Sequence, residues 1–176
     1  MGQLNGSEIL AKALKREGVE ELFFLMGGPM LTAEAATIQE GIRCIDVRHE
    51  QAAAMMAQAY SRLRQKPGFC MAASGPATIN LSTGLANALI DCCPVVALGG
   101  ASPMLGNGKQ VFQEIDQMEI MSGCVKYAAR IYDARRIPEM LNVAIQKAMS
   151  GKPGPVYLDL PGDTLYQMVD EDAIDW

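Results

Sequence analysis

Four apolar segments, most of them ending in a turn of small residues, are the feature that most limits how this chain can fold. The segments are residues 22–26, 42–47, 69–73 and 95–98, and three of them run into Gly27-Gly28-Pro29, Ser74-Gly75-Pro76 and Gly99-Gly100-Ala101. Stretches with helical periodicity separate them. Strands that alternate with helices indicate an α/β fold, in which a parallel sheet is covered on both faces. The turns of such a sheet meet at its carboxyl edge, where ligands bind in open α/β domains.

The whole chain can be assigned to this kind of fold. Strands are predicted at residues 21–26, 42–47, 69–73, 95–98, 125–131 and 156–160, and helices at about 30–39, 50–64, 78–89 and 133–149. A further helix near the N-terminus can be capped by Asn5 or Ser7 and ends at Gly18. A long loop over residues 100–111 leads to a short segment at 113–121. We therefore predict one three-layer, doubly wound α/β domain over residues 1–176, with a six-stranded parallel sheet and an acidic tail from about residue 168.

Size and composition exclude several classes of protein. The 176 residues are 49% hydrophobic, which is enough for a core. The net charge is −5 and no basic cluster occurs, so neither nucleic acid nor a membrane is expected as a partner. No apolar run approaches the length of a membrane span and no signal peptide is seen, so a cytoplasmic location is expected. Five cysteines without zinc-type spacing, and a single histidine, predict no metal site on this chain.

Glu50 is the strongest candidate for chemistry in this framework. It stands between the apolar segment 42–47 and an Ala- and Met-rich helix, so its carboxylate lies on the first turn of that helix. Burial and a helix N-terminus act in opposite directions on the proton affinity of a carboxylate, which suits such a group to proton exchange. The alternative is a solvated glutamate at a helix start with no chemical role. The small-residue turns expected at the same sheet edge favour the first interpretation.

Short motifs are spread over almost the whole chain. They are Gly27-Gly28-Pro29, Arg48-His49-Glu50-Gln51-Ala52-Ala53, Lys66-Pro67-Gly68, Ser74-Gly75-Pro76, Phe112-Gln113-Glu114 and the segment 151–161. In this order and spacing they resemble the pyrimidine-binding domain of the thiamine diphosphate enzymes. The resemblance implies the fold predicted above, and it implies that thiamine diphosphate is the cofactor.

Two segments, residues 93–102 and 113–118, are most similar to 2-hydroxyacyl-CoA lyases and oxalyl-CoA decarboxylases. Acetolactate synthases share the general pattern and follow closely. The resemblance therefore implies a lyase that cleaves a 2-hydroxyacyl-CoA to a carbonyl compound and formyl-CoA. Oxalyl-CoA decarboxylation, and an acetolactate synthase-like carboligation that uses a 2-keto acid, are the alternatives.

The resemblance also implies roles for single residues. Glu50 would hydrogen-bond N1′ of the pyrimidine ring and promote the imino form at the neighbouring 4′ nitrogen, which removes the proton from C2 of the thiazolium. Contacts to the cofactor are expected from Gly27, Gly28, Pro29, Glu50, Ser74, Pro76 and Asn80. Residues expected near the substrate are Met30, His49, Gln113 and Glu114. The alternatives are a core role for Met30, a structural role for His49, and a solvated helix start for Gln113 and Glu114.

The other half of such a site is not found in this sequence. The family binds the diphosphate through Mg²⁺ on a second domain that carries a Gly-Asp-Gly motif, and the nearest match here is Gly162-Asp163-Thr164. We therefore expect a hetero-oligomer in which a larger chain carries the diphosphate-binding domain and most of the Mg²⁺ site. The other possibility is that the chain is the N-terminal part of one long enzyme.

Two functions of other classes compete with this interpretation. A Rossmann-type nucleotide-binding domain is disfavoured because no Gly-x-Gly-x-x-Gly follows the first strand. A regulatory or scaffold domain without catalysis is disfavoured because Glu50 is present. Binding of thiamine diphosphate that depends on a second chain would separate these possibilities.

Overall fold

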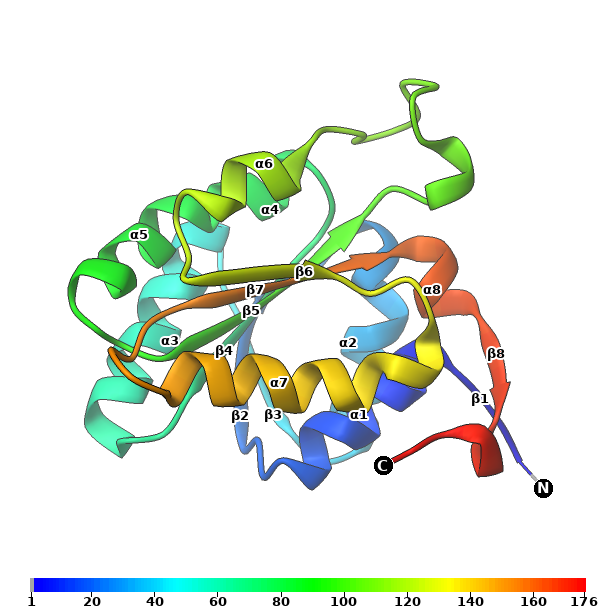
Figure 1. Cartoon of the computed structure of the whole chain (residues 1–176), viewed down its shortest axis with the longest axis horizontal. Helices are drawn as coiled ribbons and strands as arrows, with labels where there is room; N and C mark the ends of the chain where they lie inside the picture. Colours follow the sequence, from blue (N-terminus) through cyan, green and yellow to red (C-terminus); the bar gives the residue numbers. More distant parts are fainter. Residues whose placement is uncertain (1) are drawn as a thin grey trace.

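The structure, a computed structural model that describes residues 2–176, is built around a six-stranded parallel sheet (Figure 1). The strands are β2 (Glu21–Leu25), β3 (Arg43–Asp46), β4 (Gly68–Ala72), β5 (Val95–Ala101), β6 (Tyr127–Arg130) and β7 (Val156–Pro161). Their order in the sheet is β3-β2-β4-β5-β7-β6, and every neighbouring pair is parallel. The predicted α/β fold with a six-stranded parallel sheet is confirmed.

Helices cover both faces of this sheet. They are α1 (Gly6–Arg16), α2 (Leu31–Gln39), α3 (Glu50–Arg64), α4 (Pro76–Asn80), α5 (Ser82–Ile90), α6 (Gln117–Ser122), α7 (Ile137–Met149) and α8 (Gly162–Tyr166). One hydrophobic cluster joins the sheet to α1, α2 and α7, and a second joins it to α3 and α5 (Figure 1). Because both faces are covered, β4, β5 and β7 are buried along their whole length, as is typical of parallel sheets.

Local sequence explains where two of these helices begin and end. Asn5 caps α1: its side chain accepts a hydrogen bond from the N–H of Glu8 at 3.0 Å, and the Glu8 carboxylate accepts one from the Asn5 N–H at 2.8 Å. This reciprocal capping box satisfies two free N–H groups of the first turn. The helix α3 ends at Arg64 and is capped by Gln65 in the left-handed conformation, with a φ of 56°, and the predicted turn at Pro67 follows.

The structure corrects three details of the predicted elements. Residues 99–101 were expected in a turn, but β5 continues through them because β7 pairs with it as far as Pro161. The helix predicted over residues 78–89 is divided by Leu81 into α4 and α5, and α4 already starts at Pro76, a residue that suits the first turn. A small antiparallel pair, β1 (Gln3–Asn5) with β8 (Met168–Asp170), was not predicted.

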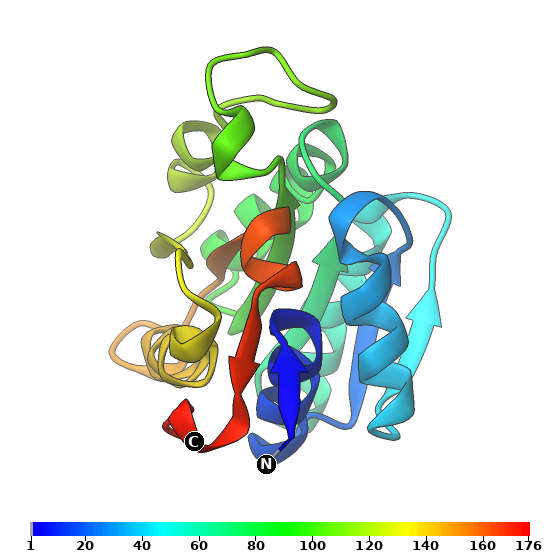
Figure 2. The same ribbon diagram turned by 90° about the vertical axis from the view of Figure 1, so that its right-hand side faces the viewer.

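That antiparallel pair brings the two ends of the described chain together. Figure 2 shows β1 and β8 side by side, at the end of the molecule opposite the long loop that follows β5. The only tryptophan, Trp176, packs against the core, and the guanidinium of Arg16 lies 4.1 Å from the centre of its ring. None of the helices found in residues 2–176 is both long and apolar enough to cross a membrane.

Candidate functional site

The strand order creates a crevice at the carboxyl edge of the sheet. β2 and β4 are neighbours although β3 comes between them in the sequence, so successive connections leave this point in opposite directions. Ligands bind at such topological switch points in open α/β folds. The turn after β2, Gly27-Gly28-Pro29, and the turn after β4, Ser74-Gly75-Pro76, therefore flank this position.

Glu50 lies at this edge as the first residue of α3. Its side chain is buried, at 7% exposed, and Asn80 Nδ2 at the end of α4 donates a hydrogen bond to Glu50 Oε2 at 2.9 Å. Because an amide N–H is already bound to Oε2, the carboxylate has a fixed orientation. It still has an oxygen, Oε1, without a hydrogen-bond partner among the described residues, available to a ligand or to solvent. The structure thus brings together Glu50 and Asn80, two residues that the sequence suggested separately.

The turn after β4 is closed by the segment that precedes α6. Ser74 Oγ donates to Gln113 Oε1 at 2.6 Å, and a Cβ added to Gly75 would lie 2.3 Å from the carbonyl oxygen of Gln113. The φ of Gly75 is 59° and its ψ is −119°, a conformation that only glycine adopts readily. Gly75 is therefore required both by its own backbone and by the close approach of Gln113.

The turn after β2 meets the same residues from the other side. Gly28 has a φ of +51°, and a Cβ on it would lie 3.3 Å from Ser74 Oγ and 3.5 Å from Gln113 Oε1. A Cβ added to Gly27 would similarly lie 3.1 Å from the Cβ of Ala73. Three segments that are far apart in the sequence thus meet around the Ser74 hydroxyl.

A cavity of about 300 Å³ opens beside this meeting point. Its lining residues are Gly28, Pro29, Ser74, Ala101, Ser102, Pro103, Val111, Phe112, Gly162 and Tyr166. None of them carries a charge, and Phe112 is 83% exposed at the rim. Cavities of about 300 and 340 Å³ at residues 17–21 and around Trp176 contain no predicted site residue, and a larger one of about 490 Å³ beside the long loop contains only Glu114, whereas the cavity next to Ser74 contains Gly28, Pro29 and Ser74. We therefore place the candidate site at the cavity next to Ser74.

The remaining predicted residues have contacts of other kinds. Met30 is fully buried and packs against Gly100 of β5, and a Cβ on that glycine would lie 2.8 Å from Met30 Cγ. His49 is exposed and caps α3, where its Nδ1 accepts a hydrogen bond from the Gln51 N–H at 3.2 Å. These contacts give Met30 a place in the core and His49 a helix-capping role, the structural roles that the sequence left open as alternatives.

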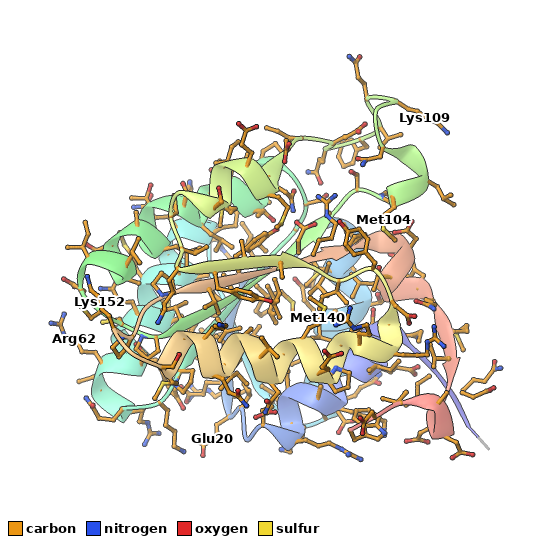
Figure 3. The ribbon with its side chains drawn as sticks, viewed as in Figure 1. Glu20, Arg62, Met104, Lys109, Met140 and Lys152 are labelled. Atoms are coloured by element: carbon orange, nitrogen blue, oxygen red, sulfur yellow. The ribbon has the colours of Figure 1, made fainter. Side chains whose placement is uncertain are left out.

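Glu114 organises the long loop between β5 and α6. Its carboxylate accepts hydrogen bonds from the N–H of Gly108 at 2.5 Å and of Val111 at 3.0 Å. The Gly108 bond is the largest of the effects that lower the pKa of Glu114. Figure 3 shows Lys109 at the outer end of this loop, beyond Met104. Glu114 thus fixes the fold of the segment that carries Phe112 and Gln113.

Sequence reasoning missed the polar residues beneath the Ser74 turn. Gln117, Tyr157 and Asp159 are at most 1% exposed and hydrogen-bond to one another. Polar residues at positions that the strand and helix periodicity assigns to the interior were the available signal. Among the described residues, no group of three or more His, Cys, Asp or Glu side chains is arranged to hold a metal ion.

Comparison with known proteins points to one family. The family described as "Thiamine pyrophosphate enzyme, N-terminal TPP binding domain" matches residues 4–120. The chain is 40% identical over 164 residues to chloroplastic acetolactate synthase of Arabidopsis thaliana, covering 93% of this chain and 24% of the relative.

Two further relatives carry names of two different activities. The chain is 37% identical over 175 residues to the acetolactate synthase isozyme 2 large subunit of Escherichia coli (strain K12), covering 98% of this chain and 31% of the relative. It is 40% identical over 162 residues to 2-hydroxyacyl-CoA lyase 2 of Caenorhabditis elegans, covering 92% of this chain and 25% of the relative. The chain thus spans only 24–31% of the length of these three relatives.

Proposed function

Because the chain belongs to the thiamine pyrophosphate enzyme family by its match to the N-terminal TPP-binding domain, we propose that it supplies the pyrimidine-binding half of a C–C lyase or carboligase. The observation that carries this proposal is the buried carboxylate of Glu50, fixed by Asn80 at the sheet edge. Thiamine diphosphate, when bound, supplies the carbon nucleophile and the electron sink that C–C bond cleavage requires.

The residues of this edge fit the aminopyrimidine end of that cofactor. The amide of Asn80 holds Oε2 of Glu50, which leaves Oε1 to share a proton with N1′ of a pyrimidine ring. The glycines of the β2 turn let a flat ring approach the backbone closely, since no side chain projects from Gly27 or Gly28. Ser74 and Pro76 would line the ring from the β4 side, and Gln113, held by Ser74, would stand beside the reacting carbon.

A partner chain or a further domain is required for the diphosphate. The relatives are three to four times longer than this chain, since it covers only 24–31% of them. In this chain the segment nearest to Gly-Asp-Gly forms the start of α8, where Gly162 and Thr164 are buried. We propose that the diphosphate and Mg²⁺ are held mainly by the partner, and that the edge described above lies against it.

For the substrate we propose a 2-hydroxyacyl-CoA, cleaved to a carbonyl compound and formyl-CoA. The similarity of residues 93–102 and 113–118 supports this choice, and residues 101–103 and 111–112 line the cavity. The uncharged lining suits the neutral acyl end of such a substrate. Acetolactate synthesis from a 2-keto acid is the second candidate, favoured by the acetolactate synthases among the relatives, and oxalyl-CoA decarboxylation is the third.

Proton exchange at C2 of the bound cofactor tests the role of Glu50 directly. In the assembly with the diphosphate-binding partner, we expect Glu50→Gln to slow hydrogen–deuterium exchange at C2 by about 10²–10⁴-fold, because a positioned proton-transfer group contributes about that much. Binding of thiamine diphosphate should be largely retained, since the amide keeps the shape of the side chain.

A matched control separates this role from that of any helix-start acid. Glu139 lies in the first turn of α7, away from the site, and pairs with Arg136. Glu139→Gln should leave C2 exchange unchanged. Equal exchange rates in wild type and Glu50→Gln would remove Glu50 from the mechanism. Assays with a 2-hydroxyacyl-CoA, oxalyl-CoA and pyruvate then rank the three candidate reactions, and a lack of thiamine diphosphate binding in any assembly would favour a scaffold role.

A further inference from the structure

Gln117, the first residue of α6, occupies the centre of a buried polar cluster. It is 1% exposed, and its side-chain amide contacts three strands or the turns that follow them. Oε1 accepts a hydrogen bond from the N–H of Gly75 at 2.8 Å. Nε2 lies 2.7 Å from the carbonyl oxygen of Gly100, 2.7 Å from the Tyr157 hydroxyl and 2.6 Å from Asp159 Oδ1.

The neighbours of this amide fix its orientation. Tyr157 donates its hydroxyl proton to Asp159 Oδ1 at 2.5 Å, so it accepts from Gln117 rather than donating to it. Asp159 is fully buried, and Arg130 Nε donates to its other oxygen, Oδ2, at 2.5 Å. Every contact of Nε2 is therefore with an acceptor. The nitrogen must face the sheet, and the oxygen must face Gly75.

The Gly75 N–H that Gln117 binds belongs to the turn of the candidate site. Gly75 is buried, and among residues 2–176 Gln117 Oε1 is the only acceptor of its N–H. Gln113, four residues before Gln117, holds the same turn through Ser74 Oγ and by its carbonyl oxygen against Gly75. Gln113, in the segment that precedes α6, and Gln117, the first residue of α6, thus hold the turn after β4 at two places.

We propose that Gln117 is a positioning residue, which holds the Ser74-Gly75-Pro76 turn and Gln113 in the arrangement that the cofactor site requires. The link to the cofactor site rests on the proposed function, whereas the hydrogen bonds that hold the turn lie within this chain. Without Oε1, the Gly75 N–H would be buried with no acceptor, which destabilises that local arrangement. The turn would then move away from Gln113 to find a partner or water.

Two variants distinguish loss of the Gln117–Gly75 hydrogen bond from a general loss of stability. Gln117→Met keeps the approximate length of the side chain but replaces Oε1 with a thioether, whose sulfur is only a weak acceptor for the Gly75 N–H. Tyr157→Phe removes a hydroxyl from the same cluster, while Gln117 keeps Gly100 and Asp159 as acceptors and its bond to Gly75. Both variants are expected to lower global stability, but only Gln117→Met should release the turn.

Amide hydrogen exchange of the chain itself measures this release without any cofactor. In Gln117→Met we expect exchange at Gly75 to accelerate about tenfold more than at Met71 and Ala72 of β4, the amount that one lost hydrogen bond implies. In Tyr157→Phe the three amides should accelerate together. A Gly75 amide that follows Met71 and Ala72 in Gln117→Met would overturn the proposal.

A measurement on the wild-type chain keeps the proposal testable if Gln117→Met fails to fold. The bond from Gly75 N–H to Gln117 Oε1 should give a through-hydrogen-bond NMR coupling between Gly75 N and Gln117 Cδ, and its absence would also overturn the proposal.

In the full assembly, the Kd of thiamine diphosphate should rise about tenfold in Gln117→Met and stay near wild type in Tyr157→Phe. Released exchange at Gly75 together with an unchanged Kd would refute the link to the cofactor site while leaving the role of Glu50 untouched.

Discussion

Glu34 of α2 is buried in an unusual way, and replacing it should stabilise the protein. It is 1% exposed, and neither carboxylate oxygen has a hydrogen-bond partner among the described residues. Burial, and to a lesser extent the charge of Asp46, raises its pKa from 4.5 to about 7. Glu34→Gln keeps the volume of the side chain and removes the ionisation. We expect the variant to be more stable than wild type at neutral and alkaline pH.

The raised pKa sets both the size and the pH range of the effect. The folded chain holds the Glu34 proton more tightly than the unfolded chain, so stability is full below pH 4.5 and falls as the pH rises to about 7. One pKa unit corresponds to about 1.4 kcal/mol, so a rise of about 2.5 units makes the loss at most about 3.5 kcal/mol. Because α2 is a surface helix and water relaxes part of this cost, we expect Glu34→Gln to add about 1–3 kcal/mol at about pH 8.

Urea unfolding followed by Trp176 fluorescence or circular dichroism, at about pH 4 and about pH 8, measures this difference. Glu40→Gln is the control, because Glu40 ends the same helix but is only partly buried. The gain in Glu34→Gln should nearly vanish at the lower pH, and Glu40→Gln should show no such dependence. A gain that is the same at both pH values, or no gain at all, would show that Glu34 is not held as a buried acid.

Three further substitutions test the packing of the chain. Gly75→Ala should destabilise the protein by about 2 kcal/mol or more, because the φ of Gly75 is positive and the new Cβ would lie 2.3 Å from the carbonyl oxygen of Gln113. Urea unfolding measures this loss, and an unchanged stability would mean that the turn is mobile. Asn5→Ala should cost about 1 kcal/mol through loss of the capping box, measured in the same way, and an unchanged midpoint would mean that the first turn of α1 frays. Arg16→Met should change the fluorescence of Trp176 and lower stability by about 0.5–1 kcal/mol, because the cation packs on its ring, and an unaltered spectrum would place that ring elsewhere.

The sequence alone determined the features that depend on neighbouring residues. The apolar segments and their Gly, Ser and Pro turns predicted six parallel strands, and Asn5 was one of two residues suggested as the cap of the first helix. Glu50 was predicted at a helix start, and it is the first residue of α3. Helix and strand periodicity, helix capping and turn formation depend on residues that are close in the sequence, so short sequence patterns predict them.

Local patterns were less informative where an element depends on what packs against it. Gly99 and Gly100 have the composition of a turn, yet they belong to β5 because β7 lies beside them and supplies the hydrogen bonds. The short strands β1 and β8 have no apolar pattern of their own and form only because the two ends of the chain meet. A backbone hydrogen bond between distant segments requires no particular side chains, so the residue pattern of neither segment predicts it.

Only the tertiary structure decided which side chains meet at the site. Asn80 reaches Glu50 across 30 residues, and Gln117 reaches Gly75 across 42, because the strand order β3-β2-β4-β5 places these segments together. Glu34 lies in a predicted helix, but its burial without a partner follows from which face of α2 meets the sheet. The reason is physical: sequence spacing sets the period and face of each element, whereas contacts between elements depend on the order and packing that the whole chain adopts.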